Sequence, residues 1–446
     1  MTEEIDNFTC NEIRIGIVGS VDSGKSTITG VLTKGELDNG RGSARSHILK
    51  HPHEKQSGRT SDIAQHFVRE GDNIVEYIDL AGHEKYSKTT IGGIKKCDID
   101  YGMLTVGLNM GVLPITRDHC ELILSSNVPI FVVCTKNDLP SDYIRDQTLN
   151  SIEMLFKNKN PDKKNPKYKT LIIDNDISFE ENENIKDVLE NYTYLKKKSE
   201  MKSLLIPIFR VSSVTGYGID IVKKFIFNLK QYKNYDDNVT ESSNFIINNG
   251  YYVNGVGVIA SGFVKQGVIK IKDKLFLGPD EHGKFKEVTV RSIHNNFREH
   301  VEYLSSGQGG SFNIVFTGKD KIKKADIKKG YRLLQDKVCF KQFTAIVKIL
   351  KHSSTISLGY QPTIHIGNVS QCAEIKKIYK KKNRSNSGGD DGDGDDGKFL
   401  RIGDVAHIDF EFLIKPEYID INSNFIFREG KAKGVGKILE RIAYDS

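Results

Sequence analysis

A glycine-rich segment near the start of the chain, Gly19-Ser20-Val21-Asp22-Ser23-Gly24-Lys25-Ser26, fits the phosphate-loop pattern of Gly, four residues, Gly-Lys-Ser/Thr. The apolar run 13–18 before it predicts a buried strand, and residues 27–32 after it predict the start of a helix. A strand, a glycine loop and a helix in this order aim backbone N–H groups at a polyphosphate. We therefore expect an α/β domain in which Lys25 reaches the β- and γ-phosphates and Ser26 ligates Mg²⁺. A chance glycine turn between strand and helix is the alternative.

A second expected strand, over residues 74–78, is followed by Asp79-Leu80-Ala81-Gly82-His83-Glu84. Asp79 is placed to hold a water bound to Mg²⁺, and the Gly82 amide is placed to contact the γ-phosphate. When that phosphate leaves, the segment loses a partner and can move. His83 stands where an imidazole can orient an attacking water, and a solvent-exposed loop histidine is the alternative.

A base-recognition pattern, Thr135-Lys136-Asn137-Asp138, follows the apolar run 129–134. Lys136 can lie along a purine ring, and the Asp138 carboxylate can accept hydrogen bonds from guanine N1–H and the 2-amino group. Adenine offers no such donors, so the carboxylate would be left unpaired. The backbone of Ser212-Ser213-Val214, after another short expected strand, is placed to contact guanine O6. These features together predict a guanine nucleotide site.

Six blocks of sequence, one of which extends the Asp79 segment, point to one group of proteins. They are 35–42 (GELDNGRG), 57–61 (SGRTS), 79–86 (DLAGHEKY), 127–133 (NVPIFVV), 256–262 (VGVIASG) and 427–430 (FREG). Through them the chain resembles translational GTPases of the elongation factor Tu/1-alpha superfamily, and more closely the GTP-binding protein 1/GTP-binding protein 2 subfamily. Agreement over this many separated blocks is highly specific.

The resemblance implies roles for four residues. Thr60 matches the switch I threonine, whose hydroxyl and carbonyl meet Mg²⁺ and the γ-phosphate. His83 matches the catalytic histidine of switch II, and Val21 matches the apolar gate residue beside it. Asp22 matches a phosphate-loop aspartate that helps to bind a monovalent cation.

The complete expected site has three parts. The catalytic residue is His83, and the metal ligands are Ser26, Thr60 and Asp79. The nucleotide-binding residues are Gly19, Val21, Asp22, Ser23, Gly24, Lys25, Ser26, Thr27, Thr60, Gly82, Thr135, Lys136, Asp138, Ser212, Ser213 and Val214.

Two positions depart from the common pattern. Thr135 stands where most GTPases carry Asn, so we expect the loss of an amide donor that braces the phosphate loop, and with it a modest guanine affinity. The stretch between Thr60 and Asp79 is shorter than in animal-type relatives, which leaves the switch I conformation open.

The pattern predicts three domains, an α/β P-loop GTPase domain followed by two antiparallel β-barrels. The GTPase domain is expected over 11–235, with a Lys- and Asn-rich, partly disordered insertion near 157–203 whose fragment 170–173 can form a strand. Short β-branched runs separated by Gly, Asp and Asn turns predict the barrels over 243–337 and 340–443. The second barrel carries an acidic Gly/Asp loop near 385–397.

Composition limits the class of protein. A chain of 446 residues predicts about three domains, and no apolar run approaches the roughly 20 residues that span a membrane. The first eleven residues are polar and acidic, unlike a signal peptide, so the chain is expected to be cytoplasmic. Its six scattered cysteines form no Cys-x-x-Cys pair, and we expect neither structural zinc nor disulfides.

The net charge of +7 is compatible with contact to the phosphates of RNA or a ribosome, although lysine-rich linkers can supply the excess by themselves. The leading hypothesis is a Mg²⁺-dependent GTP-hydrolysing switch in translation elongation, ribosome rescue or RNA surveillance, with ribosomes, tRNA or mRNA-decay machinery as partners. The alternative is a GTP-dependent carrier of tRNA or of a decoding-factor-like protein, in which hydrolysis serves release. A scaffold with a silent site is disfavoured by the presence of Lys25, Thr60, Asp79 and His83. No contact with DNA or membrane is expected.

Overall fold

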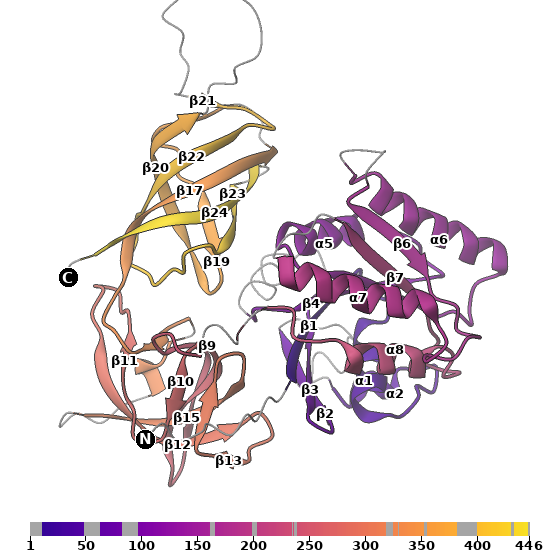
Figure 1. Cartoon of the computed structure of the whole chain (residues 1–446), viewed down its shortest axis with the longest axis horizontal. Helices are drawn as coiled ribbons and strands as arrows, with labels where there is room; N and C mark the ends of the chain where they lie inside the picture. Colours follow the sequence, from indigo (N-terminus) through magenta and orange to yellow (C-terminus); the bar gives the residue numbers. More distant parts are fainter. Residues whose placement is uncertain are drawn as a thin grey trace, which may run out of the picture. The chain divides into compact units, whose positions relative to one another are not determined.

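The computed structural model describes residues 11–48, 63–82, 97–160, 166–198, 203–233, 235, 239–317, 324–328, 330–351, 355–380, 399–429 and 432–444. The chain divides into two compact units, Met1–Asn234 and Tyr235–Ser446 (Figure 1). Two residues of the expected site, Thr60 and His83, lie outside the described residues.

The first unit is built on a seven-stranded sheet with the strand order β2-β3-β1-β4-β5-β7-β6. The strands are β1 (Asn11–Gly19), β2 (Ala64–Glu70), β3 (Asn73–Asp79), β4 (Tyr101–Gly107), β5 (Ile130–Thr135), β6 (Tyr168–Ile172) and β7 (Leu204–Arg210). All neighbours run parallel except β2 and β3. The central strands are buried along their whole length, because helices cover both faces of a parallel sheet. This explains why their sequences are continuous apolar runs.

The helices of this unit are α1 (Lys25–Lys34), α2 (Ser43–Ser46), α5 (Pro114–Ser125), α6 (Asp142–Lys157), α7 (Glu183–Lys198) and α8 (Ile219–Asn228). In Figure 1, α7 and α8 lie in front of the sheet, and the rings of Tyr192 and Phe225 meet between them with centroids 6.4 Å apart. Among the described residues, no helix combines the length and the apolar character needed to cross a bilayer.

Within the stretch 157–203, the strand expected over 170–173 is confirmed by β6, at the edge of the sheet. The expectation of disorder is wrong for residues 183–198, which form the sixteen-residue helix α7. Ile185, Val188, Tyr192 and Leu195 recur at helical spacing and are buried, so α7 is held by an apolar stripe. The Lys, Asn and Glu residues that suggested disorder belong to the other face of this amphipathic helix.

The second unit begins with a closed barrel. Its strands are β8 (Asn244–Val253), β9 (Gly257–Gln266), β11 (Lys274–Gly278), β12 (Lys286–Asn295), β15 (Gly309–Phe316) and β16 (Arg332–Leu334). The order β11-β16-β8-β9-β15-β12 closes because β12 also pairs with β11. The short elements β10 (Val268–Lys270), β13 (His300–Val301), β14 (Tyr303–Ser305) and the 3₁₀ turn η3 (Lys324–Asp326) complete this barrel. Its interior is apolar, with Phe245 and Phe312 in ring contact at 4.4 Å.

A second closed barrel follows, with the strand order β17-β22-β20-β19-β23-β24. Its strands are β17 (Phe340–Lys351), β19 (Thr363–Ile366), β20 (Val369–Lys380), β22 (Val405–Phe412), β23 (Asn424–Glu429) and β24 (Ala432–Ala443), and β18 (Ile356–Ser357) pairs with β21 (Phe399–Leu400) beside them. Phe343 stacks on Phe410 and makes a tilted ring contact with Phe412 in the apolar core of this barrel. The expected fold class, an α/β domain followed by two antiparallel β-barrels, is confirmed.

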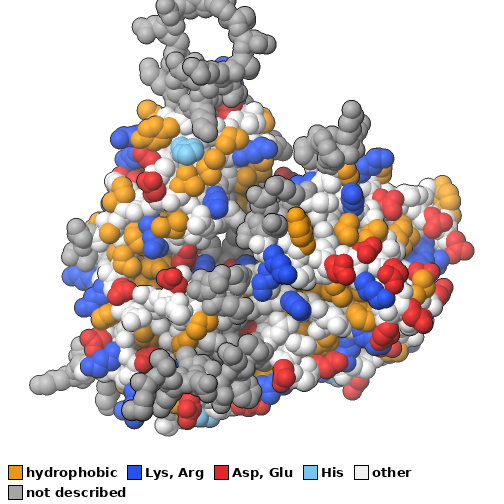
Figure 2. All heavy atoms as spheres, viewed as in Figure 1, with side chains coloured by type: hydrophobic (Ala, Val, Ile, Leu, Met, Phe, Trp, Pro, Cys, Tyr) orange, Lys and Arg blue, Asp and Glu red, His pale blue; other side chains and the backbone are white. Residues whose placement is uncertain are grey.

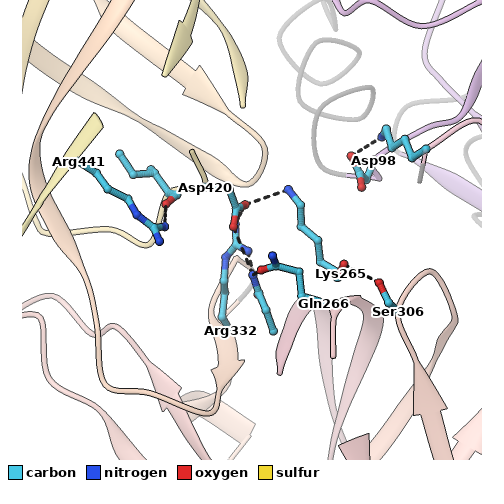
Figure 3. A network of polar contacts seen from close by, with 10 residues as sticks. Asp98, Lys265, Gln266, Ser306, Arg332, Asp420 and Arg441 are labelled. Atoms are coloured by element: carbon cyan, nitrogen blue, oxygen red, sulfur yellow. Dashed lines mark hydrogen bonds and ion pairs between the residues drawn. The ribbon is translucent and has the colours of Figure 1, made fainter. Parts of the chain in front are cut away.

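An ionic network joins the two barrels around Asp420 (Figure 3). Lys265 and Arg332 of the first barrel reach the Asp420 carboxylate of the second at 2.9 Å and 3.3 Å. The Arg332 guanidinium also donates to Asn244 Oδ1 at 2.9 Å and lies over the Tyr418 ring at 4.6 Å. Burial opposes ionisation of Asp420, but Arg332 and Lys265 prevail and lower its pKa to about 2. The barrels are therefore joined by a charged cluster as well as by the chain.

Candidate nucleotide site

The expected nucleotide motifs meet at one edge of the sheet. Strand β1 ends at Gly19, β3 at Asp79 and β5 at Thr135, and the parallel ladders align these carboxyl ends. Strand β7 ends at Arg210, and its continuation pairs with β5 through a 2.7 Å bond from Val211 N–H to the Cys134 carbonyl. Ligands of open parallel sheets bind outside this edge. Segments far apart in sequence thus converge on a single site.

The phosphate loop has the backbone that its glycines predict. Gly19 has φ +153°, and a Cβ there would lie 2.3 Å from the Thr105 carbonyl oxygen, so only glycine fits beside β4. Lys25 turns back over the loop, where its Nζ donates to the carbonyls of Ser20 at 2.8 Å and Gly19 at 3.2 Å. Burial lowers the pKa of Lys25, and the charges of Asp79 and Asp22 oppose this shift. A buried amine thus lies over a glycine loop at the start of a helix, an arrangement that suits a polyphosphate.

The expected metal ligands Ser26 and Asp79 lie together. Ser26 Oγ donates to Asp79 Oδ2 at 2.7 Å, and Asp79 is only 1% exposed. A hydroxyl and a carboxylate are hard oxygen donors of the kind that Mg²⁺ prefers. These two side chains therefore fit a Mg²⁺ site; Thr60, the third expected ligand, falls outside the described residues.

Gly82 lies directly against the phosphate loop. A Cβ at this position would lie 2.2 Å from Lys25 Nζ and 2.9 Å from the Gly19 carbonyl oxygen. Any side chain here would displace Lys25, so only glycine lets this segment approach the phosphate loop so closely. His83 is the next residue and lies outside the described part, so its role stays a prediction.

A cavity of about 390 Å³ opens between the phosphate loop and the base-recognition motif. Its walls include seven expected residues, namely Gly24, Thr27, Thr135, Lys136, Asp138, Ser213 and Val214. Ser212 lies behind the wall, where its Oγ accepts from the N–H groups of Val214 at 3.3 Å and Thr215 at 3.1 Å. Val21 is half-buried and Asp22 is exposed on the loop itself.

The base-recognition motif is anchored by its backbone. Asn137 N–H donates to the Val211 carbonyl at 3.0 Å, and Arg145 donates to the Asn137 carbonyl at 3.4 Å. Lys136 takes a left-handed φ of +61°. This sharp turn leaves Asp138 exposed on the cavity wall, with its carboxylate available to a ligand.

Thr135 corrects one expectation from the sequence. The loss of the asparagine amide does not remove the brace of the phosphate loop, because Thr135 Oγ1 donates to the Ser23 carbonyl at 2.6 Å. Thr135 is buried, so water cannot substitute for this bond. The Thr135 hydroxyl therefore replaces the asparagine amide as the donor. The reason given for a modest guanine affinity, the loss of this donor, does not apply.

His119 on α5 is a second brace that sequence reasoning missed. Gly19 N–H donates to its Nδ1 at 3.2 Å, so the neutral imidazole carries its proton on Nε2. Burial, followed by the charge of Lys25, lowers the pKa of His119 to about 4. A lone histidine in an amphipathic helix gives no signal in the sequence, because only the fold brings it under the loop.

Six other cavity residues were also missed as site residues. They are Asp38, Gly40, Arg41, Gly42, Arg45 and Leu139. Most of them lie in or beside the block 35–42, which the sequence analysis used only for the resemblance. The glycines and arginines of this block are visible in the sequence, but the sequence does not show that the block lies beside the cavity.

Comparisons with known proteins agree with this geometry. The elongation factor Tu GTP binding domain family matches residues 11–245, more than half of the chain. GTP-binding protein 1 of Xenopus laevis is 35% identical over 96% of the chain, and GTP-binding protein 2 of Homo sapiens is 31% identical over 98%. The chain spans 63% of the length of the first relative and 70% of the second.

A solved structure shares the fold. Translation elongation factor SelB from Methanococcus maripaludis, in complex with the GTP analogue GppNHp, superposes with a TM-score of 0.66 at 18% identity. The match covers 96% of this chain and 79% of that one. It therefore includes both the α/β domain and the barrels.

Proposed function

The chain belongs to the elongation factor Tu GTP binding domain family, and from this premise we propose that it is a molecular switch that binds and hydrolyses GTP. One observation carries the proposal: the buried Lys25, the Ser26–Asp79 pair and the Asp138 cavity meet at a single sheet edge. A polyphosphate and a guanine base are the two ends of one ligand, and this edge has a place for each.

Selection of the base rests on Asp138. Its carboxylate accepts from guanine N1–H and the 2-amino group, while Lys136 lies along the ring. Adenine presents an acceptor at the first position and no amino group at the second, so it leaves the carboxylate unpaired. The backbone of the Ser212–Val214 loop completes the base pocket at O6.

Phosphate binding rests on the loop and on Lys25, whose Nζ now donates to loop carbonyls and would turn to the β- and γ-phosphates. Ser26 and Asp79, with Thr60, would hold Mg²⁺, which supplies charge neutralisation on the phosphate oxygens when bound. Asp22 would help to bind a monovalent cation. Lys25 needs little reorganisation, because it already lies buried over the loop.

Hydrolysis is direct attack of water on the γ-phosphate, with no covalent intermediate. His83 orients this water, and Val21 is the apolar gate beside it. The Gly82 amide holds the γ-phosphate, so its release frees the segment that follows Asp79. This movement is the switch.

We propose the ribosome or an RNA, such as tRNA, as the partner that reads the switch, which would place the chain in the cytoplasm. The net charge of +7 and the elongation factors in its family support a phosphate-rich partner. On the face drawn in Figure 2, acidic and basic side chains are interspersed over the described residues. An RNA bound to this face would therefore contact individual basic side chains and not one continuous basic patch.

The test is turnover of GTP by the purified chain, with and without ribosomes, against ATP as the competing substrate. We expect Mg²⁺-dependent release of phosphate from GTP, accelerated by ribosomes, and none from ATP. Equal turnover of ATP, or tight GTP binding that never leads to hydrolysis, would contradict the proposal.

A further inference from the structure

The 38–45 loop, whose last residues begin the short helix α2 (Ser43–Ser46), borders the nucleotide cavity and has no part in the function described so far. We infer that Arg41 and Arg45 of this loop form an anion subsite for a phosphate ester on the ribose of the bound guanine nucleotide. This inference rests on the proposed function and adds a second set of phosphate ligands to the same site.

Asp38 organises the loop. One of its carboxylate oxygens accepts from Gly40 N–H at 2.9 Å and Gly42 N–H at 3.1 Å, and the other accepts from Ala44 N–H at 2.9 Å. Gly40 and Gly42 have φ values of +78° and +90°, in the left-handed region that glycine favours. The backbone of the loop is thus wrapped around one buried carboxylate, which restricts its movement.

The loop is also held against the two walls of the cavity. Asp38 N–H donates to the Ser213 carbonyl at 2.8 Å, which ties the loop to the base pocket. At its other end, Ala44 packs so closely on α1 that a Cβ on Gly30 would lie 2.3 Å from its carbonyl oxygen. Both anchors belong to elements that line the cavity, the Ser213 loop and α1 through Thr27, so the loop keeps a defined place beside it.

Arg41 and Arg45 are the cations that this loop brings to the cavity wall. The Arg45 guanidinium lies against Gly42, where a Cβ would lie 2.4 Å from its Nε. Within the described part of the chain, neither guanidinium has an ion-pair partner. The Asp38 carboxylate, the nearest acid in sequence, is occupied by backbone N–H groups. The loop therefore presents two cations to the cavity.

The position of the cavity identifies the part of the nucleotide that these cations meet. Its walls include Gly24 of the phosphate loop, Thr27 of α1 and Asp138 of the base pocket, but neither Lys25 nor Ser26. It therefore covers the base, the ribose and the phosphate next to the ribose, while the β- and γ-phosphates lie toward Lys25. A guanidinium matches two phosphate oxygens with parallel N–H donors.

Two sources can supply such a phosphate. One is the α-phosphate, which GTP, GDP and GMP share; the other is a phosphate on a ribose hydroxyl, as in a guanosine 3′-phosphate. An α-phosphate contact would strengthen binding of GTP and GDP alike without favouring the transition state.

The experiment measures the affinity of the full chain for GMP, GDP and guanosine 3′-monophosphate by titration calorimetry in Mg²⁺ buffer. Arg41→Gln, Arg45→Gln and the double variant are compared with wild type. Loss of one charged hydrogen bond weakens binding by about tenfold, and we expect this loss for GMP and GDP in each single variant. Arg45→Lys keeps the positive charge but not the two parallel N–H donors of the guanidinium, so it should lose less nucleotide affinity than Arg45→Gln.

Arg117→Gln is the matched control, because Arg117 is an exposed arginine of the same domain and does not line the cavity. It should bind all three nucleotides as wild type does, which separates the subsite from the overall charge. Thermal unfolding of the nucleotide-free variants verifies that each one folds.

The outcomes separate the subsite from the proposed function. A loss for GMP and GDP supports the α-phosphate, and a loss confined to guanosine 3′-monophosphate supports the subsite with the ribose phosphate as its ligand. Unchanged affinities in the double variant, in a chain whose wild type binds GDP, would overturn the subsite alone. A wild type that binds no guanine nucleotide would overturn the proposed function as well.

Discussion

The hydroxyl of Thr135 donates a 2.6 Å hydrogen bond to the carbonyl of Ser23, which joins the end of β5 to the phosphate loop. This bond connects the proposed base-recognition motif to the proposed phosphate-binding loop. The N–H of Gly19 donates a hydrogen bond to Nδ1 of His119 at 3.2 Å. Two side chains from two different elements therefore brace the backbone of the loop.

Removing the Thr135 hydroxyl should weaken nucleotide binding. Thr135→Val keeps the shape of the side chain but leaves the buried Ser23 carbonyl unpaired, at a cost of about 1–3 kcal/mol. We expect the affinity for GDP to fall by about tenfold or more. Thr135→Ser keeps the donor and should stay within about twofold of wild type. GDP titrations of both variants check this, and equal affinities would show that the brace is dispensable.

Phosphate binding should depend on Lys25 and Ser26 in different ways. Lys25→Ala removes the buried cation of the loop and should weaken GTP binding by about tenfold or more, whether or not Mg²⁺ is present. Ser26→Ala removes a metal ligand, so its loss should be seen in Mg²⁺ buffer and disappear when EDTA removes the metal. GTP titrations in the two buffers measure this. Wild-type affinity of both variants in Mg²⁺ buffer would mean that the loop is only a turn.

His83→Ala should slow hydrolysis without weakening binding. The change deletes the proposed water-positioning group, but Lys25, Ser26 and Asp138 remain. Losses of this kind amount to roughly two to four orders of magnitude in rate. Ribosome-stimulated turnover is the quantity to measure, with GTP affinity as the control. Undiminished stimulated turnover would remove His83 from the mechanism and leave the water to the switch backbone or to the partner.

Asp420 should stabilise the pair of barrels in a pH-dependent way. Arg332 and Lys265 lower its pKa from the ordinary 3.8 to about 2, so the carboxylate stabilises the folded state above pH 4 and loses this effect as pH falls toward 2. Asp420→Asn should therefore lower the free energy of unfolding by about 2 kcal/mol at pH 7. The difference from wild type should shrink between pH 4 and pH 2.

Denaturant unfolding followed by circular dichroism measures this difference. Asp336→Asn, at an exposed position of the same unit, is the control and should behave as wild type at each pH. A constant difference between Asp420→Asn and wild type across the acid range would show that the ionised carboxylate is not the source of the stability.

The sequence predicted the parts of the fold that follow from local patterns. The phosphate loop and the apolar strands before it were predicted because glycine spacing and buried parallel strands leave direct signals. Helix α7 was missed because its charged face dominates the composition of 183–198, and the four buried residues of its other face were overlooked. Composition averages over both faces of an amphipathic helix, whereas periodicity separates them.

The missed site residues are those whose roles depend on tertiary contacts. His119 lies a hundred positions from Gly19, and Arg41 and Arg45 reach the cavity only because Asp38 folds their loop against Ser213. Thr135 was identified but misjudged, because a hydroxyl and an amide can donate to the same carbonyl. Pattern matching compares residue types, whereas the hydrogen bond requires only that some donor reaches the Ser23 carbonyl with suitable geometry.

The central claim is that this sheet edge binds a guanine nucleotide through Asp138, and the nucleotide preference of Asp138→Asn tests it most directly. Xanthine carries a carbonyl where guanine carries its 2-amino group, so an amide that can donate suits xanthine better than a carboxylate does. Competition between GTP and XTP for wild type and Asp138→Asn is the measurement. We expect wild type to prefer GTP and Asp138→Asn to lose GTP affinity and prefer XTP. An unchanged GTP affinity and an unchanged preference for GTP over XTP in Asp138→Asn would contradict the account.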